Sequence, residues 1–129
     1  MGKSKCRAVV MAALFVVGAL TGCDSKDEWS SGKYSVYWID ARENRKLGRD
    51  VGGGTIARVA PTVIAVGEDE TWIVAKRRGA DGREWFYYFR KSADNDSNSG
   101  SEVVEGPFEE REFEQRRSQY GLPMFQKTF

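Results

Sequence analysis

Histidine is absent from this 129-residue chain, and cysteine occurs only at positions 6 and 23. Histidine is the commonest general base and the commonest metal ligand. Its absence excludes Ser–His and Cys–His nucleophile pairs and zinc sites built from histidine and cysteine. The sequence therefore predicts a protein that is not an enzyme and that holds no cofactor.

A long hydrophobic run is also missing. The longest apolar stretch, 8–20, has 13 residues, whereas a transmembrane helix needs about 20. Three basic residues precede the stretch (Lys3, Lys5 and Arg7), and Leu20-Thr21-Gly22-Cys23 ends it. A positive start, a short apolar core and small residues before a cleavage point are typical of a secretory signal peptide. We therefore predict that residues 1–22 form a signal peptide.

The segment Leu20-Thr21-Gly22-Cys23 resembles the lipobox of bacterial lipoproteins. That resemblance implies lipid on the Cys23 thiol, cleavage between Gly22 and Cys23, and a mature chain that begins at Cys23. Asp24 follows the cysteine, which resembles the signal that retains lipoproteins in the inner membrane of enteric bacteria. The expected location is a bacterial membrane, with the domain facing the periplasm or the cell exterior.

The predicted mature chain is small and almost neutral. Of 20 basic and 19 acidic residues, the three basic residues of the leader are removed, which leaves 17 against 19 and a formal charge of −2. A nucleic-acid-binding domain would carry a strongly basic stripe, so nucleic acid is not an expected partner. Residues 23–32 read as a polar tether, and residues 33–129 as one domain rich in aromatic side chains.

Alternation of apolar and polar residues predicts an antiparallel sheet. Residues 33–40, 71–76 and 84–91 place aromatic or β-branched side chains at every second position, as strands do. Shorter apolar runs at 55–60, 62–66 and 102–105 bring the total to about five or six strands. Aromatic residues occupy both faces of the 84–91 strand, which favours a central position in the sheet.

The C-terminal part predicts one helix. Residues 92–101 contain only Ser, Ala, Asp, Asn and Gly, a composition typical of a flexible loop. Residues 107–120 follow, with Pro107 at the expected first position, acidic residues early, basic residues late and Gly121 as the C-terminal cap. The predicted fold class is α+β: a small antiparallel sheet with this helix packed on it.

The order of these elements resembles a group of small bacterial lipoproteins known only as a domain of unknown function. The segments that carry the resemblance are the three alternating strands, the Gly106-Pro107-Phe108-Glu109-Glu110 sequence, and Phe113. The resemblance implies the fold, and it brings no catalytic residues.

Two patterns are candidate binding sites. Tyr34, Trp38, Trp85, Tyr87 and Phe89 could form an aromatic binding surface, although most of them are expected in the core. Protein interfaces are enriched in such side chains. Separately, Asp94, Asp96, Asn98 and Glu105 resemble the ligand spacing of a calcium-binding EF-hand loop. Ser99 stands where that loop needs glycine, so we expect no metal there.

Together, these features predict a non-enzymatic lipoprotein whose domain binds another protein. The alternative is narrower: an immunity or inhibitor lipoprotein that neutralises a toxin or hydrolase directed at the periplasm. The sequence does not determine the oligomeric state.

The substitution Cys23→Ala tests the lipid anchor. Because lipid is attached to the thiol before cleavage, the variant should lose both modification and normal processing. Wild-type protein should stay with membranes through a high-salt wash, since two or more acyl chains hold a protein firmly while one binds only marginally. Membrane fractionation and the intact mass of the mature N-terminus measure both effects. Wild-type protein that is soluble with an unmodified Cys23 would contradict the lipobox interpretation.

Overall fold

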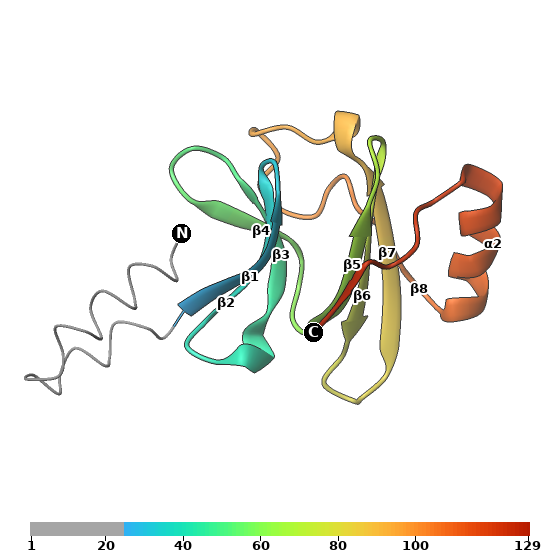
Figure 1. The fold of residues 1–129 in the computed structure, drawn as a ribbon, viewed down its shortest axis with the longest axis horizontal. Coiled ribbons are helices and arrows are strands. Elements are labelled where there is room, and N and C mark those ends of the chain that lie inside the picture. The colour runs from blue at the N-terminus through green and yellow to red at the C-terminus, as the bar shows by residue number, and fades with distance from the viewer. Residues whose placement is uncertain (1–24) are drawn as a thin grey trace, which may run out of the picture.

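The computed structural model describes residues 25–129, so the predictions for the leader, Cys23 and Asp24 lie outside the described part. Within these residues the chain forms nine strands and one α-helix (Figure 1). The element bounds are β1 Ser25–Ser31, β2 Tyr34–Ile39, β3 Lys46–Asp50, β4 Thr55–Val59, β5 Val63–Glu68, β6 Trp72–Arg78, β7 Glu84–Arg90, β8 Glu105–Phe108, α2 Glu110–Tyr120 and β9 Lys127–Thr128.

The strands form two antiparallel sheets. Sheet A is a meander in the order β1-β2-β3-β4, and sheet B has the order β8-β7-β6-β5-β9. Figure 1 shows sheet A, sheet B and α2 as three successive layers. The predicted α+β class is confirmed, with two sheets where one was expected. No helix among residues 25–129 has the length and hydrophobicity of a membrane span.

Sheet B is the middle layer. Successive side chains of β7 point to opposite faces of this sheet, so the strand contributes to the packing on both sides. Phe89 contributes to a core shared with sheet A, whose other buried members are mainly aliphatic. Phe86 and Tyr88 point the other way and pack with Phe113 of α2. The strand therefore lies inside the sheet, between β8 and β6, as the aromatic residues on both of its faces predicted.

The predicted tether is wrong over most of its length. Residues 25–31 form β1, which pairs with β2 from Ser25 opposite Ile39 to Ser31 opposite Tyr34. Trp29 packs against the core between the sheets. Burial of this side chain and the pairing with β2 stabilise residues 25–31 as a strand, although their polar composition indicated a linker.

The helix begins three residues later than predicted, at Glu110, and β8 takes Pro107. β8 is the edge of sheet B. Proline lacks an N–H donor, which costs little in an edge strand, so Pro107 fits there. The predicted end of the helix is confirmed: Gly121 has φ 68°, and its N–H donates to the Arg117 carbonyl. The final strand, predicted around Val103 and Val104, is shifted to Glu105–Phe108.

Five strands, β2, β4, β5, β6 and β7, lie within two residues of their predicted bounds, and three strands, β1, β3 and β9, were missed. The hairpin β5–β6 and the turn at Asp81-Gly82 that leads into β7 lie where alternation and turn residues placed them. β3 was missed because Lys46–Asp50 reads as a charged segment, and β9 because it has only two residues.

Replacing Phe113 by alanine tests the layer between sheet B and α2. The side chain is fully buried, and its ring stacks on Phe86 with centroids 5.0 Å apart. Phe113→Ala should therefore lower the free energy of unfolding by about 3–5 kcal/mol, measured by urea denaturation of the mature chain. The control is Met124→Ala, because Met124 is 67% exposed and should change stability by less than about 0.5 kcal/mol. A loss below about 1 kcal/mol for Phe113→Ala would contradict the packing.

Candidate functional site

A groove lies between α2 and the end of sheet B where β6 begins and β7 ends. Its volume is about 380 Å³. The lining residues come from β6, β7, β8, α2 and the segment between β7 and β8: Trp72, Tyr88, Arg90, Ala93, Val103, Glu105, Arg116 and Tyr120. We call it the aromatic–arginine groove, because aromatic rings and guanidinium groups dominate it.

Three aromatic rings form the floor of the groove. Trp72 and Tyr88 meet edge to face with ring centroids 5.6 Å apart. Tyr120 lies 6.0 Å from each of them. Trp72 and Tyr88 are held by β6 and β7, which place them on the helix-facing side of sheet B. Tyr120 is 43% exposed, so the cluster presents an aromatic surface to a ligand.

Two arginines border this floor. The Arg90 guanidinium lies 4.5 Å from the centre of the Trp72 ring, and that of Arg116 lies 4.2 Å from the centre of Phe108. Arg116 also donates to the Tyr88 hydroxyl at 3.0 Å and pairs with Glu112 at 3.1 Å. The bonds to Tyr88 and Glu112 raise the pKa of Arg116. Stacking and hydrogen bonding orient the Arg116 guanidinium, while the exposed Arg90 guanidinium is held by its contact with the Trp72 ring.

The side chains that line this groove are of kinds common in protein interfaces. Tyrosine, tryptophan and arginine are the residues most enriched where truncation weakens protein interfaces. The charged members are two guanidinium groups and the Glu105 carboxylate, so the groove favours a ligand with both apolar and acidic groups. Among residues 25–129, no group of three or more acidic or sulfur side chains is arranged to hold a metal ion.

The predicted aromatic surface is distributed differently. Tyr34 and Phe89 are buried in the core between the sheets, with their rings 5.5 Å apart, so they cannot contact a partner. Trp38, Trp85 and Tyr87 are half-buried, and Tyr87 packs against the same core. The prediction is wrong for Tyr34 and Phe89, because each lies on the face of its own sheet that the other sheet covers.

The aromatic–arginine groove was not found from the sequence. Trp72 and Tyr88 fall in the predicted strands 71–76 and 84–91, and Arg116 and Tyr120 fall in the predicted helix 107–120. Two features of the sequence could have indicated the groove. The second face of β7 also carries aromatic residues, and the helix ends in Tyr120. Only the packing of α2 against sheet B brings these residues together.

The residues that resemble a calcium loop serve a different purpose. Asp94 is buried, and both of its oxygens accept hydrogen bonds from Arg58 at 2.9 and 3.0 Å. Asn98 and the Tyr34 hydroxyl also donate to it, each at 2.8 Å. Burial alone would raise the pKa of Asp94, but the hydrogen bonds from Arg58, Asn98 and Tyr34 and the charge of Arg58 hold it below its ordinary value.

The other members of that pattern are separated from Asp94. Asp96 pairs with Lys33 at 3.1 Å and with Arg49 at 2.9 Å. Glu105 lies in β8, opposite Tyr88. Arginine and lysine side chains therefore surround Asp94 and Asp96, where a calcium loop would need further oxygen atoms. The predicted flexible loop at 92–101 is wrong in this respect, because Asp94 ties it to sheet A.

Tyr34 completes this network. Burial, followed by the hydrogen bond to Asp94, raises the pKa of Tyr34 to about 12. The hydroxyl therefore stays protonated at neutral pH, so that it donates to Asp94 and accepts from Arg49 at 2.8 Å. This arrangement indicates a structural role for the buried polar cluster.

Comparison of the chain with family models, curated proteins and solved structures finds no match. The resemblance to small bacterial lipoproteins therefore stays a prediction. Function has to be argued from the surfaces of the domain itself.

Replacing Asp94 by asparagine tests the buried ion pair. The change leaves the fully buried Arg58 guanidinium without its counter-charge, so the free energy of unfolding should fall by about 3–5 kcal/mol at pH 7. Urea denaturation across a pH series measures the effect. Asp96→Asn, at the exposed end of the same network, is the control and should change stability far less.

The pH dependence follows from the lowered pKa of Asp94. A carboxyl group whose pKa is lower in the folded state stabilises fully above its unfolded value of about 3.9. That contribution is lost as the pH falls through the lower folded value. Wild-type protein should therefore lose stability below about pH 4, and Asp94→Asn should show a flatter profile. Equal acid sensitivity in both proteins would contradict the role of Asp94.

Proposed function

We propose that this protein is a non-enzymatic lipoprotein of the bacterial envelope that binds a protein partner through the aromatic–arginine groove. The observation that carries the proposal is the cluster of Trp72, Tyr88 and Tyr120 beneath two fixed arginines. The anchor is the lipid predicted on Cys23, which keeps the domain at the membrane surface.

The geometry of the groove supports a macromolecular ligand. Rigid aromatic side chains supply contact area at a low entropic cost, and oriented guanidinium groups supply directional donors. Tyr120 is 43% exposed and Trp72 is half-buried. A partner that covers the three rings would bury this apolar surface, and that burial would favour binding. We infer that the partner presents a segment with an apolar side chain beside a carboxylate.

A non-enzymatic role is consistent with the side chains present. The chain lacks histidine, and its two cysteines lie in and next to the predicted leader. General acid–base catalysis needs a group whose pKa lies near the operating pH, and the groove contributes arginines, tyrosines and one glutamate. These groups can bind and orient a ligand.

Site-specific photo-crosslinking in living cells tests this proposal. A photoreactive amino acid at position 120 should form one defined crosslink to an envelope protein. The control position is Arg83, which precedes β7 and lies a full strand length from Arg90. Arg90→Glu reverses one charge at the rim, and it should reduce the crosslink at least about tenfold, equivalent to 1.4 kcal/mol. Equal crosslinking at both positions, or a product unaffected by Arg90→Glu, would contradict the proposed site.

A further inference from the structure

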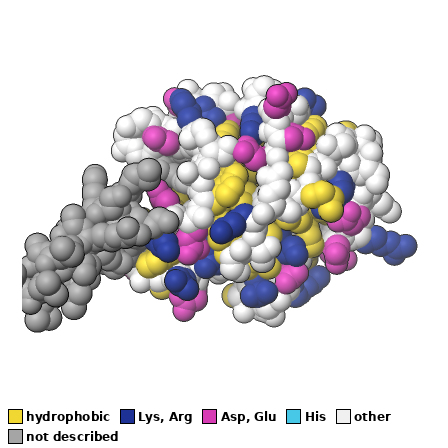
Figure 2. Space-filling view, viewed as in Figure 1, with side chains coloured by type: hydrophobic (Ala, Val, Ile, Leu, Met, Phe, Trp, Pro, Cys, Tyr) yellow, Lys and Arg dark blue, Asp and Glu magenta, His cyan; other side chains and the backbone are white. Residues whose placement is uncertain are grey.

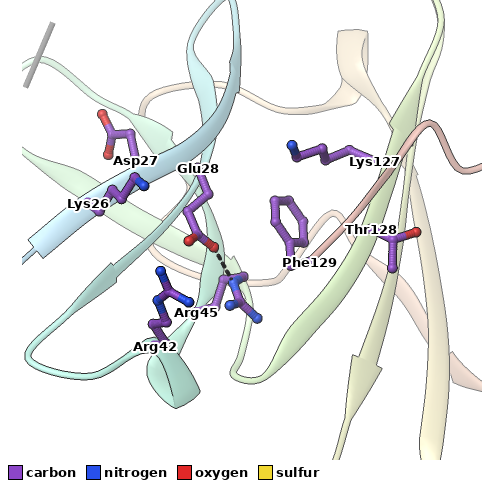
Figure 3. Close-up of a pocket in the computed structure, with 8 residues that line it drawn as sticks. All are labelled: Lys26, Asp27, Glu28, Arg42, Arg45, Lys127, Thr128 and Phe129. Carbon is purple, nitrogen blue, oxygen red and sulfur yellow. Dashed lines mark hydrogen bonds and ion pairs between the residues drawn. The ribbon is translucent and has the colours of Figure 1, made fainter. Parts of the chain in front are cut away.

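A second cavity lies on the opposite side of sheet B from the aromatic–arginine groove, where the edges of the two sheets face each other. Its volume is about 310 Å³. β1 forms one wall and β9 the other, and the turn between β2 and β3 closes one end (Figure 3). We call it the edge cleft. Both walls are edge strands of their sheets, so the cleft is the open seam of the sandwich.

Part of the charge in the edge cleft is neutralised internally. Arg45 pairs with Glu28 at 2.5 Å and donates to the Val63 carbonyl at 3.2 Å. Its guanidinium also lies 5.1 Å from the centre of the Phe129 ring. Burial alone would raise the pKa of Glu28, but Arg45 holds it below its ordinary value, so the pair stays ionised at neutral pH. Arg45 and Glu28 thus form a fixed, neutral inner wall.

Three further cations face the cleft and lack such a partner. Among residues 25–129, no carboxylate lies within 4.0 Å of the charged groups of Lys26, Arg42 or Lys127. Figure 3 shows Lys127 extending from β9 toward β1, while the Asp27 carboxylate points away from Phe129. Asp27 pairs in register with Tyr37, on the outer face of sheet A. Asp27 and Glu28 are the two acidic side chains among the lining residues, against the four basic side chains of Lys26, Arg42, Arg45 and Lys127, so the edge cleft carries an excess of positive charge.

The edge cleft includes Lys26, which is close in the sequence to the predicted lipid on Cys23. This closeness indicates that an anion bound in the cleft would come from the membrane. Three peptide units separate Lys26 from Cys23, which limits the distance between their backbones to about 11 Å. The headgroup layer of a bilayer is itself about 5–7 Å thick on each side. A lipid on Cys23 would therefore hold the start of β1 beside the phosphates of neighbouring phospholipids.

An exposed hydrophobic side chain lies at the same end of β1. Ile39 is 51% exposed and pairs in register with Ser25, the first residue of the strand. Figure 2 shows lysine and arginine side chains along both the lower and the upper part of one face of the domain, with acidic side chains between them. An apolar side chain next to cations is the pattern of a surface that rests on a membrane.

We propose that the edge cleft binds the phosphate of an anionic phospholipid headgroup through Lys26, Arg42 and Lys127. The inference rests on the proposed lipid anchor at Cys23. Binding would fix the orientation of the domain, with the β1 and β9 edges toward the bilayer. The aromatic–arginine groove, on the far side of sheet B, would then face away from the membrane toward its partner.

Lysine footprinting of the full lipidated protein in vesicles tests the inference. Labelling by an amine-reactive ester is compared between pure phosphatidylcholine and vesicles that contain phosphatidylglycerol. Lys26 and Lys127 should label at least about threefold more slowly in the anionic vesicles. Lys33, in the turn at the opposite end of the β1–β2 hairpin, is the internal control and should label equally in both.

A matched pair of variants identifies the residues responsible. Arg42→Ser combined with Lys127→Ser should abolish the protection of Lys26. Lys33→Ser combined with Arg111→Ser removes the same charge from exposed positions elsewhere and should leave that protection intact. Loss of protection in both double variants would show a general charge effect and would overturn the proposed site.

The remaining outcomes separate the two proposals. Lipidated protein whose Lys26 and Lys127 label equally in both kinds of vesicle would overturn the edge cleft alone. Full-length protein recovered without lipid on Cys23 would overturn the anchor and this inference together. Protection of Lys26 by millimolar inorganic phosphate in neutral vesicles, with no further effect of phosphatidylglycerol, would assign the site to free phosphate and overturn the membrane role.

Discussion

The ion pair between Arg58 and Asp94 holds the two sheets together at one end of the domain. Arg58 belongs to β4 of sheet A, and Asp94 follows β7 of sheet B. Both side chains are buried, and a buried charge is tolerated only when it is paired and hydrogen-bonded. The polar segment after β7 must therefore return to sheet A. This path closes the core around Tyr34 and Phe89 and leads the chain toward β8.

With that end closed, sheet B becomes the middle layer, and the two proposed binding surfaces lie at the edges of the layers. The aromatic–arginine groove occupies the rim between sheet B and α2, and the edge cleft occupies the seam between β1 and β9. Each site combines side chains held by contacts within the domain with positively charged side chains that can still interact with a ligand. Their places on opposite sides of sheet B would allow a domain with the proposed lipid anchor to face a membrane and a partner at the same time.

The parts of the fold that depend on local pattern were predictable. Alternation at 84–91 and turn chemistry at Asp81-Gly82 depend on nearest neighbours in the chain, and both agree with the structure. β1 and the binding groove were not predictable. The stability of β1 comes from β2 and from the burial of Trp29, and the groove needs residues from β6, β7 and α2. Contacts between distant segments leave no periodic signal.

The sequence by itself determined the α+β class, the C-terminal helix with its glycine cap, and the absence of histidine chemistry, because these depend on composition and on spacing within single segments. The tertiary structure alone decided which aromatic residues are core and which are surface. The alternation of side chains along a strand assigns each residue to one face of the sheet, but it does not determine what covers that face. The packing of sheet A on sheet B buried Tyr34 and Phe89, and the packing of α2 on sheet B left Trp72 and Tyr120 at the rim.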